Sequence, residues 1–420
     1  MPMPEEGVTS ALVVDHVVAQ PPVASVDQAQ AMLHGRQVAA TSMGRLRSID
    51  ALRGLGALGV VLFHARGAAG LHSTDGFARL VSAFLSFGRY GVWLFFVVSG
   101  FCIHQRWVRQ SQLDPAARLD FVSFWKRRLY RLYPPFFVAL VIYLVCLTVW
   151  GGFSWNRITM WRVGRNLFLV NNFDAASAGA INGVFWTLAI EEQLYLAYFV
   201  LVRLRVRFGW TMTLCCAFLA RVSWFMVAMA LHRMWRIDVL VVESAASQWF
   251  IWTLGALAVE GACGRVSLPA WTRNAWLGTG ILGLAAGITY GYTEYLPGGP
   301  LKTLCWFFGD MIWGVGFFLW VNWAVTLERQ WQHAHRVPRL AAWLASLGIF
   351  SYSLYLTHEI VLEHLWPRLL AFRPQLFGEL SPLAGLLGLT LASVAFAWCF
   401  FRVFEKPFLS PRRPPAIASA

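Results

Sequence analysis

The chain has 420 residues, of which 58% are hydrophobic and only 13% are charged. A typical soluble domain has about a quarter charged residues, and a soluble fold of this length cannot bury so much apolar surface. The composition therefore excludes an ordinary soluble protein and predicts an integral membrane protein. The formal net charge of +14 is typical of the orientation signal of membrane proteins, so we expect no nucleic-acid partner.

Residues 1–44 contain no long apolar run, and we predict a disordered cytoplasmic tail there and a second short one over 411–420. Between them, apolar stretches near the roughly 20 residues that cross a bilayer predict one all-α domain over 45–410. We expect a polytopic bundle of about ten transmembrane helices. The predicted spans are 50–67, 85–104, 134–152, 184–202, 210–231, 247–263, 275–292, 303–325, 344–365 and 381–401.

The orientation of the bundle follows from its Lys and Arg residues. They are more frequent in the segments on the amino-terminal side, above all in 105–131, than in the segments on the other side. Because Lys and Arg gather in cytoplasmic loops, we predict a multi-pass protein of the cell (inner) membrane with both termini in the cytoplasm.

Ionisable residues occur inside the predicted spans, where each costs several kcal/mol if it faces lipid. Such residues therefore face the bundle interior, and we predict an internal polar chamber. For Arg221, Glu260 and Asp310, pairing between helices explains their presence as well as a functional site does. The ionisable residues are His64, Glu191, Glu192, Arg221, Glu260, Asp310, His358 and Glu359.

The first span carries a polar stripe made of Asp50, Arg53 and His64. Arg53 and His64 are eleven positions apart, which is three helical turns plus about 20°, so they share a face. Asp50 lies one turn before Arg53 and is its expected ion-pair partner. Histidine is the most frequent general base, although a single histidine on an apolar helix can also be a core residue. The stripe favours a catalytic role for all three residues.

The segment before the third span is basic, with Lys126, Arg127, Arg128 and Arg131 in sequence. On a helix, Arg128 and Arg131 share a face and can clamp one anion, because guanidinium groups bind phosphates in a bidentate way. A plain cytoplasmic anchor explains the composition equally well.

The fourth and ninth spans add carboxylates, hydroxyls and a second histidine. Glu191 and Glu192 are adjacent at membrane depth, where they need a partner such as histidine or arginine. A carboxylate can also orient an imidazole and stabilise its charged form. The ninth span carries Ser351, Tyr355 and His358.

These segments together resemble the acyltransferase 3 family of bacterial membrane acyltransferases, which includes surface-polysaccharide O-acetyltransferases. The resemblance covers about 45–410. Thr187 replaces the family's usual serine, Ala51 stands where glycine is common, and Glu359 follows the histidine where aromatic residues often flank it. The matching segments are Ile49–Gly54 running to His64, Leu94–Phe101, Arg128 with Arg131, Trp186–Tyr195, and Ser351–His358.

The resemblance implies a transfer reaction. An acyl group, expected to be acetyl, would pass from cytoplasmic acyl-coenzyme A to a hydroxyl of an extracytoplasmic or membrane-linked carbohydrate. Arg128 and Arg131 would dock the nucleotide phosphates, with Lys126 and Arg127 adding to the field. His64 would act as the base or carry the acyl group.

The remaining expectations concern the neighbours of His64 and the alternative functions. Glu191 or Glu192 would orient His64, and no metal is expected. Two alternatives stay open, an acyltransferase of a small molecule such as a macrolide, and a secondary transporter or flippase. Residues expected to bind the acceptor are Trp186, Ser351, Tyr355 and His358.

Overall fold

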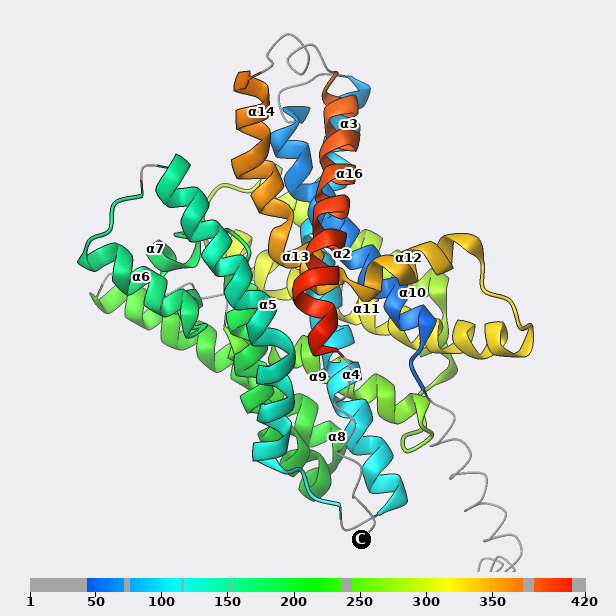
Figure 1. Cartoon of the computed structure of the whole chain (residues 1–420). Coiled ribbons are helices and arrows are strands. Elements are labelled where there is room, and N and C mark those ends of the chain that lie inside the picture. The colour runs from blue at the N-terminus through cyan, green and yellow to red at the C-terminus, as the bar shows by residue number, and fades with distance from the viewer. Residues whose placement is uncertain are drawn as a thin grey trace, which may run out of the picture.

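The computed structural model describes residues 44–71, 76–114, 117–151, 153–235, 244–372 and 381–409. Over these residues the secondary structure is helical and contains no strand, as Figure 1 shows, which confirms the all-α prediction. The two predicted tails lie outside the described residues, apart from Gly44.

The described chain is built from α-helices of very different lengths and from short helical turns. The π-helical turns η5 (Ile360–Leu365) and η6 (Phe401–Glu405) follow α13 and α16. The α-helices are α2 (Arg47–Ala68), α3 (Phe77–Ser86), α4 (Gly91–Leu113), α5 (Phe121–Trp150), α6 (Arg157–Leu167), α7 (Ala175–Ala178), α8 (Phe185–Trp235), α9 (Ala245–Ala262), α10 (Ala275–Glu294), α11 (Pro300–His333), α12 (Arg339–Ile349), α13 (Ser351–Glu359), α14 (Trp366–Phe372) and α16 (Pro382–Phe400).

Six helical segments of the described chain are long and apolar enough to cross a membrane, or seven if α12 and the bent continuation through α13 form one span. The predicted count of about ten is therefore not confirmed. The spans expected at 184–202 and 210–231 belong to the single element α8, which kinks at Gly209, where φ is 79°. Those expected at 247–263 and 275–292 form α9 and α10, which are not among the six.

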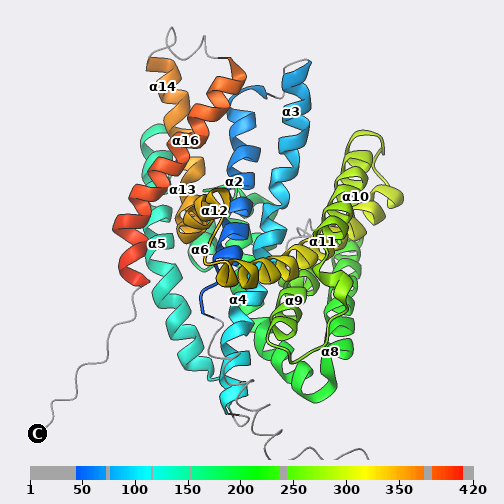
Figure 2. The ribbon, with the colours of Figure 1, turned by 90° about the vertical axis from the view of Figure 1, so that its right-hand side faces the viewer.

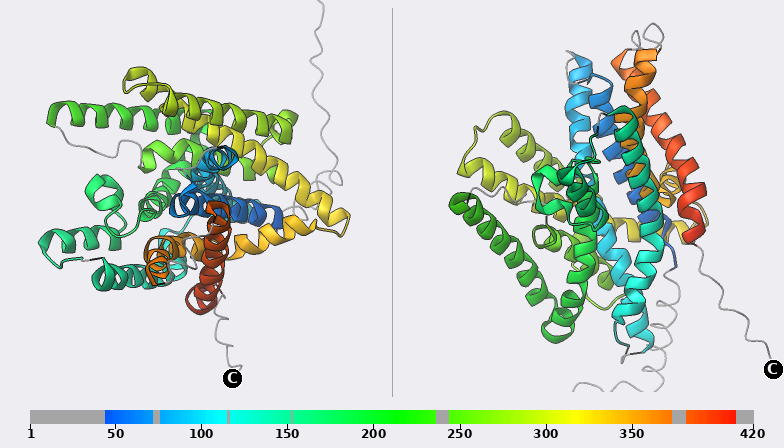
Figure 3. Two further views of the ribbon diagram at one scale, coloured as in Figure 1. Left: turned by 90° about the horizontal axis from the view of Figure 1, so that it is seen from above. Right: turned by 60° about the vertical axis from the view of Figure 1, so that its left-hand side comes forward.

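Helix α2 is the centre of the bundle. It packs against α4, α11, α12, α13 and α16. Figure 2 shows α8, α9, α10 and α11 as a group beside it, and in the view from above in Figure 3 α2 lies between that group and the orange-to-red helices. The residues of the predicted polar stripe on α2 are therefore surrounded by protein on most sides.

Two glycines allow the backbones of α2 and α12 to touch. A Cβ atom on Gly54 would lie 1.9 Å from the carbonyl oxygen of Leu344, and one on Gly348 would lie 1.9 Å from that of Asp50. Close approach of this kind is typical of membrane helix pairs. Just after the crossing, the chain bends by 67° between α12 and α13, and this bend sends α13 along α2.

We expect Gly54→Ala to destabilise the fold strongly, because the added methyl group meets backbone atoms that cannot rotate away. Overpacking usually costs about 1–3 kcal/mol, and a fixed backbone puts this variant at the upper end. The measurement is thermal unfolding of the purified protein in detergent. Gly67→Ala is the matched control on α2, because no atom lies within 4 Å of its added Cβ. Equal melting temperatures for the two variants would contradict the proposed crossing.

The ionisable residues away from α2 tie the other helices together. Arg221 on α8 contacts Asp310 on α11 at 3.2 Å and donates to the carbonyl oxygens of Ser247 and Phe307. Glu260 on α9 accepts from Arg205 on α8 at 2.6 Å and lies 3.1 Å from a ring nitrogen of the buried His104. Pairing between helices, one of the two explanations given by the sequence, therefore accounts for these buried charges.

Candidate functional site

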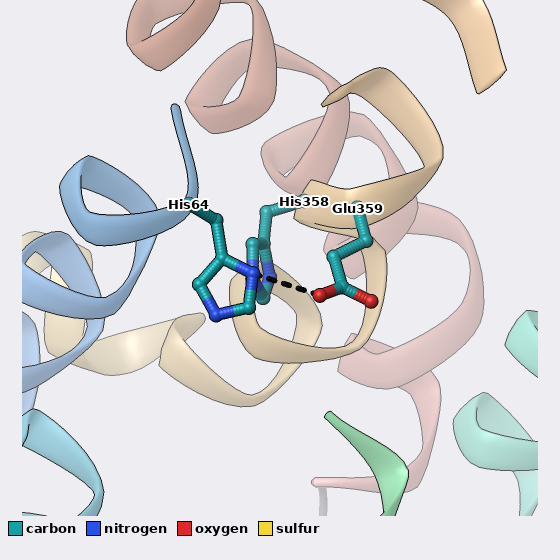
Figure 4. Close-up of side chains that lie close together, drawn as sticks. All are labelled: His64, His358 and Glu359. Carbon is teal, nitrogen blue, oxygen red and sulfur yellow. Dashed lines mark ion pairs between the residues drawn. The ribbon is translucent and has the colours of Figure 1, made fainter. Parts of the chain in front are cut away.

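The site forms where α2 and α13 run side by side. His64 from α2 meets His358 and Glu359 from the end of α13, and Figure 4 shows the three side chains facing one another. His64 Nδ1 lies 2.8 Å from Glu359 Oε1, and the two imidazole rings are edge to face with centroids 5.1 Å apart. These contacts join two segments that are almost 300 residues apart in the sequence.

The contact with Glu359 defines which nitrogen of His64 is available for chemistry. A carboxylate beside Nδ1 accepts a hydrogen bond, so Nδ1 carries the proton and Nε2 keeps its lone pair. The His64 side chain is 24% exposed, whereas that of Glu359 is only 2% exposed. A buried carboxylate behind an accessible imidazole is the arrangement that orients a general base and stabilises its charged form.

Glu359 is itself held by the backbone of Gly183. The Gly183 N–H donates to Glu359 Oε2 at 2.9 Å, so the carboxylate contacts an imidazole through one oxygen and a backbone amide through the other. A Cβ atom on Gly183 would lie only 3.1 Å from Oε1 and 3.3 Å from Oε2. The absence of a side chain at position 183 therefore lets the backbone approach the carboxylate.

Two further contacts fix the position of α13. Ser353 donates to Glu405 through its backbone N–H at 3.1 Å and through its hydroxyl at 2.5 Å. Tyr352 donates to the carbonyl oxygen of Leu132 on α5 at 2.9 Å. These bonds join α13 to η6 and to α5, and so fix the helix that carries Glu359.

His358 is fully buried and its two ring nitrogens differ. Nδ1 lies 3.0 Å and 2.9 Å from the carbonyl oxygens of Leu354 and Tyr355, so it carries the proton. Nε2 is buried without a hydrogen-bond partner among the described residues. Ligand atoms of His64, His358 and Glu359 lie within 4.8 Å of one another, a spacing that a metal ion can use. The expected absence of a metal stays a prediction.

An inner cavity of about 220 Å³ lies beside this cluster. Glu191, Thr187 and Tyr195 of α8 line it, together with Ser351 and Tyr355 of α13. The hydroxyls of Thr187 and Tyr355, two of its lining residues, are 2.6 Å apart. The rings of Tyr355 and His358 have centroids 6.0 Å apart, so the cavity wall includes a direct neighbour of the histidine pair. Among the described residues that line it, His64 does not appear.

An outer cavity of about 910 Å³ adjoins the inner one. The two share Cys102, Ile103, Arg128 and Arg131 in their linings. The predicted basic residues Lys126 and Arg127 line only the outer cavity, and Arg53 lines only the inner one. The basic segment before the third span therefore contributes to the walls of both adjoining cavities, which together are termed the channel.

The carboxylate that contacts His64 differs from the two that the sequence favoured. It is Glu359, and the catalytic roles expected for Glu191 and Glu192 stay predictions. Glu191 instead accepts from Ser99 Oγ at 2.8 Å and from the Tyr195 hydroxyl, because the face of α8 that carries it points into the inner cavity.

The other assigned residues fall in separate places. Glu192 lines a small cavity beside α5 whose wall also includes Glu191, and Trp186 packs against the apolar core and lines neither channel cavity within the described chain. Asp50 does pair with Arg53, at 3.6 Å, and with Arg45 at 2.5 Å.

We expect the double variant with Arg128→Ala and Arg131→Ala to bind an anionic donor more weakly. Each charge-assisted hydrogen bond to a phosphate contributes about 1.5–3 kcal/mol, so the donor's KM should rise by tenfold or more while the acceptor's KM changes little. Steady-state kinetics with each substrate varied in turn measure this difference. An unchanged donor KM would show that both arginines serve only the orientation signal of the membrane protein and do not bind the donor.

A helical membrane bundle that combines a carboxylate-oriented histidine with a nearby arginine-lined cavity has the parts of a membrane group-transfer enzyme. The profile of a family described as an acyltransferase domain matches residues 46–402. The chain therefore belongs to this acyltransferase family, which confirms the family resemblance predicted from the sequence.

Curated relatives are similar over parts of the chain. O-acetyltransferase OatA of Staphylococcus aureus (strain NCTC 8325 / PS 47) is 29% identical over 166 residues, which cover 36% of this chain and 24% of that protein. Nodulation protein 10 of Rhizobium leguminosarum bv. viciae is 26% identical over 232 residues, 52% of this chain and 60% of that protein. The chain thus spans about a quarter of the first and three fifths of the second. No solved structure matches it.

Proposed function

We propose that the protein transfers an acetyl group from cytoplasmic acetyl-coenzyme A to a hydroxyl of a carbohydrate that is extracytoplasmic or linked to the membrane. The observation that carries the proposal is the combination of the His64–Glu359 pair with two adjoining cavities that share Arg128 and Arg131 in their walls. The name of one relative, an O-acetyltransferase, supports acetyl as the acyl group and oxygen as the acceptor atom.

The placement of the channel supports a cytoplasmic donor. The outer cavity lies between the last turns of α4 and the first turns of α5, at the bottom of Figure 1, whereas α3 and α14 lie at the top. Because basic residues concentrate on the cytoplasmic side, we assign the α4–α5 end to the cytoplasm of the cell (inner) membrane, with both termini on that side. The acceptor then reaches His64 from the opposite end.

His64 Nε2 performs the proton transfer in the simpler of two routes. It takes the proton of the acceptor hydroxyl while that oxygen bonds to the thioester carbonyl carbon. The carbon–sulfur bond then breaks with its electron pair on sulfur, and His64 returns the proton to the thiolate. In the second route Nε2 itself attacks the carbonyl carbon, and the carbon–sulfur bond breaks with its electron pair on sulfur. The acceptor oxygen then bonds to the acyl carbon, the electron pair of the carbon–nitrogen bond returns to Nε2, and the hydroxyl proton passes through Nε2 to the thiolate. Glu359 holds Nδ1–H and balances the imidazolium in either route.

Tyr355 connects the inner cavity with the histidine pair. It lines the cavity, its hydroxyl contacts that of Thr187, and its ring neighbours His358, so a thioester that moves from this cavity to Nε2 passes Tyr355. Ser351 and Tyr355 thus line the donor's path, and His358 is the inner neighbour of the base. The acceptor-binding role expected for Trp186, Ser351, Tyr355 and His358 stays a prediction.

The direct test uses purified protein in lipid nanodiscs with radiolabelled acetyl-coenzyme A and a carbohydrate fraction from cell envelopes. We expect release of free coenzyme A thiol together with transfer of label to the carbohydrate. A transporter or flippase would consume no thioester, and that result would overturn the proposal. If the label moved only to a small molecule such as a macrolide, the protein would be an acyltransferase of a small molecule and the carbohydrate acceptor would be wrong.

A measurement without acceptor separates the two routes. Acid-quenched protein is digested after incubation with labelled acetyl-coenzyme A, and the peptide that carries His64 is examined by mass spectrometry. An added acetyl group on His64 assigns the two-step route, and an unmodified peptide with full turnover in the presence of acceptor assigns the one-step route. In the same samples, donor-dependent protection of Cys102 from alkylation reports occupancy of the channel, because Cys102 lines both cavities.

A further inference from the structure

The outer cavity contains more positive charge than the arginine pair alone supplies. Within the described residues none of its cations forms an ion pair, and the single carboxylate in its lining, Asp120, accepts the backbone N–H groups of Val122 and Ser123 at the start of α5. Unpaired cations around one cavity create a strong local field for an anion. The cations that line it are Arg106, Arg118, Lys126, Arg127, Arg128 and Arg131.

These cations follow an order along the channel. Arg128 and Arg131 lie at the junction, since they line both cavities, whereas Arg106 and Arg118 line only the outer one. Arg106 is four residues after Cys102 on α4, so the two share a face and Arg106 extends the wall one turn outward from the junction. Arg118 belongs to the connection before α5. A donor that occupied both cavities would therefore meet one cationic group at the wall that they share and others that line the outer cavity alone.

Coenzyme A carries its anionic groups in the same order. The thioester and pantetheine arm come first, the pyrophosphate follows, and the 3′-phosphate on the ribose lies farther from the sulfur. With the arm in the inner cavity, the pyrophosphate reaches Arg128 and Arg131, and the 3′-phosphate enters the outer cavity. We propose that Arg106 and Arg118 form a subsite for the 3′-phosphate, so that the enzyme selects 3′-phosphorylated donors over acyl-dephospho-coenzyme A. This inference rests on the proposed function.

The test compares acetyl-coenzyme A with acetyl-dephospho-coenzyme A in nanodiscs of phosphatidylcholine. We expect the wild-type KM to be roughly ten- to a hundredfold lower for the 3′-phosphorylated donor, as one or two charge-assisted hydrogen bonds allow. In the double variant with Arg106→Ala and Arg118→Ala, the KM for acetyl-coenzyme A should rise to that of the dephospho donor. Arg109→Ala is the matched control on α4, since Arg109 lies outside the cavity lining, and it should keep the preference.

Three results would overturn the inference while leaving the proposed function intact. The first is an equal KM for the two donors in the wild type. The second is a double variant that keeps the wild-type preference. The third is an effect of the double variant that is the same for both donors or appears only with phosphatidylglycerol in the nanodiscs, which would assign the arginines to a lipid headgroup. If the wild type turned over neither donor, the proposed function itself would fail.

Discussion

His64→Ala should lower acetyl transfer by at least about 10³-fold, because it removes the base in one route and the acyl carrier in the other. The substitution leaves the packing of α2 against α4 and α12 in place, since His64 is partly exposed and lies beyond the glycine crossing. The rate of thiol release and the transfer of label to carbohydrate are measured in parallel, in nanodiscs at matched protein concentration.

A matched control shows whether the loss belongs to position 64. His333→Ala removes an exposed imidazole at the end of α11 that contacts only its own helix in the described chain, through the carbonyl oxygen of Arg329, and it should transfer acetyl at the wild-type rate. If His64→Ala transferred acetyl at a rate near that of His333→Ala, His64 would have no catalytic role. Folding of both variants is checked by their melting temperatures in the same detergent.

The α2 stripe shows what a sequence can predict about such a site. The pairing of Asp50 with Arg53 depends only on helical periodicity, and the structure contains it. The apolar lengths likewise predicted helices at every expected span. The number of crossings is not confirmed, because the spans expected at 184–202 and 210–231 fall in one element, α8, whose two helices meet at Gly209, a residue with non-helical backbone angles.

The carboxylate that contacts His64 could not be predicted from the sequence for a different reason. Glu359 was visible as an ionisable residue within an apolar span, but no spacing rule connects positions 64 and 359. Their contact depends on the crossing at Gly54 and Gly348, on the bend between α12 and α13, and on the anchoring of Ser353 by Glu405. Glu191 was the more obvious candidate in the sequence because it has a carboxylate neighbour, yet α8 directs it into the inner cavity.

Glu359→Gln is therefore the variant that decides which carboxylate serves His64. Glutamine keeps nearly the same shape and can still contact Nδ1, but it cannot balance the imidazolium that forms when Nε2 takes a proton. We expect kcat to fall by about 10²–10⁴-fold, in the range seen when the orienting carboxylate of a catalytic triad loses its charge, with little change in the donor's KM. Steady-state kinetics with acetyl-coenzyme A measure both quantities.

The comparison with Glu191→Gln and Glu192→Gln makes this result specific. Glu191 lies in the channel wall and contacts Ser99 and Tyr195, so its variant should act mainly on the donor's KM. Glu192 lines the small cavity beside α5 but neither channel cavity, and its variant should affect kcat less than the Glu359 variant does. If either α8 variant lost most of its kcat while Glu359→Gln kept a wild-type value, the carboxylate that assists His64 during turnover would lie on α8. The α2–α13 contact would then be a structural ion pair, because a residue that orients the reacting imidazole cannot lose its charge without slowing the chemical step.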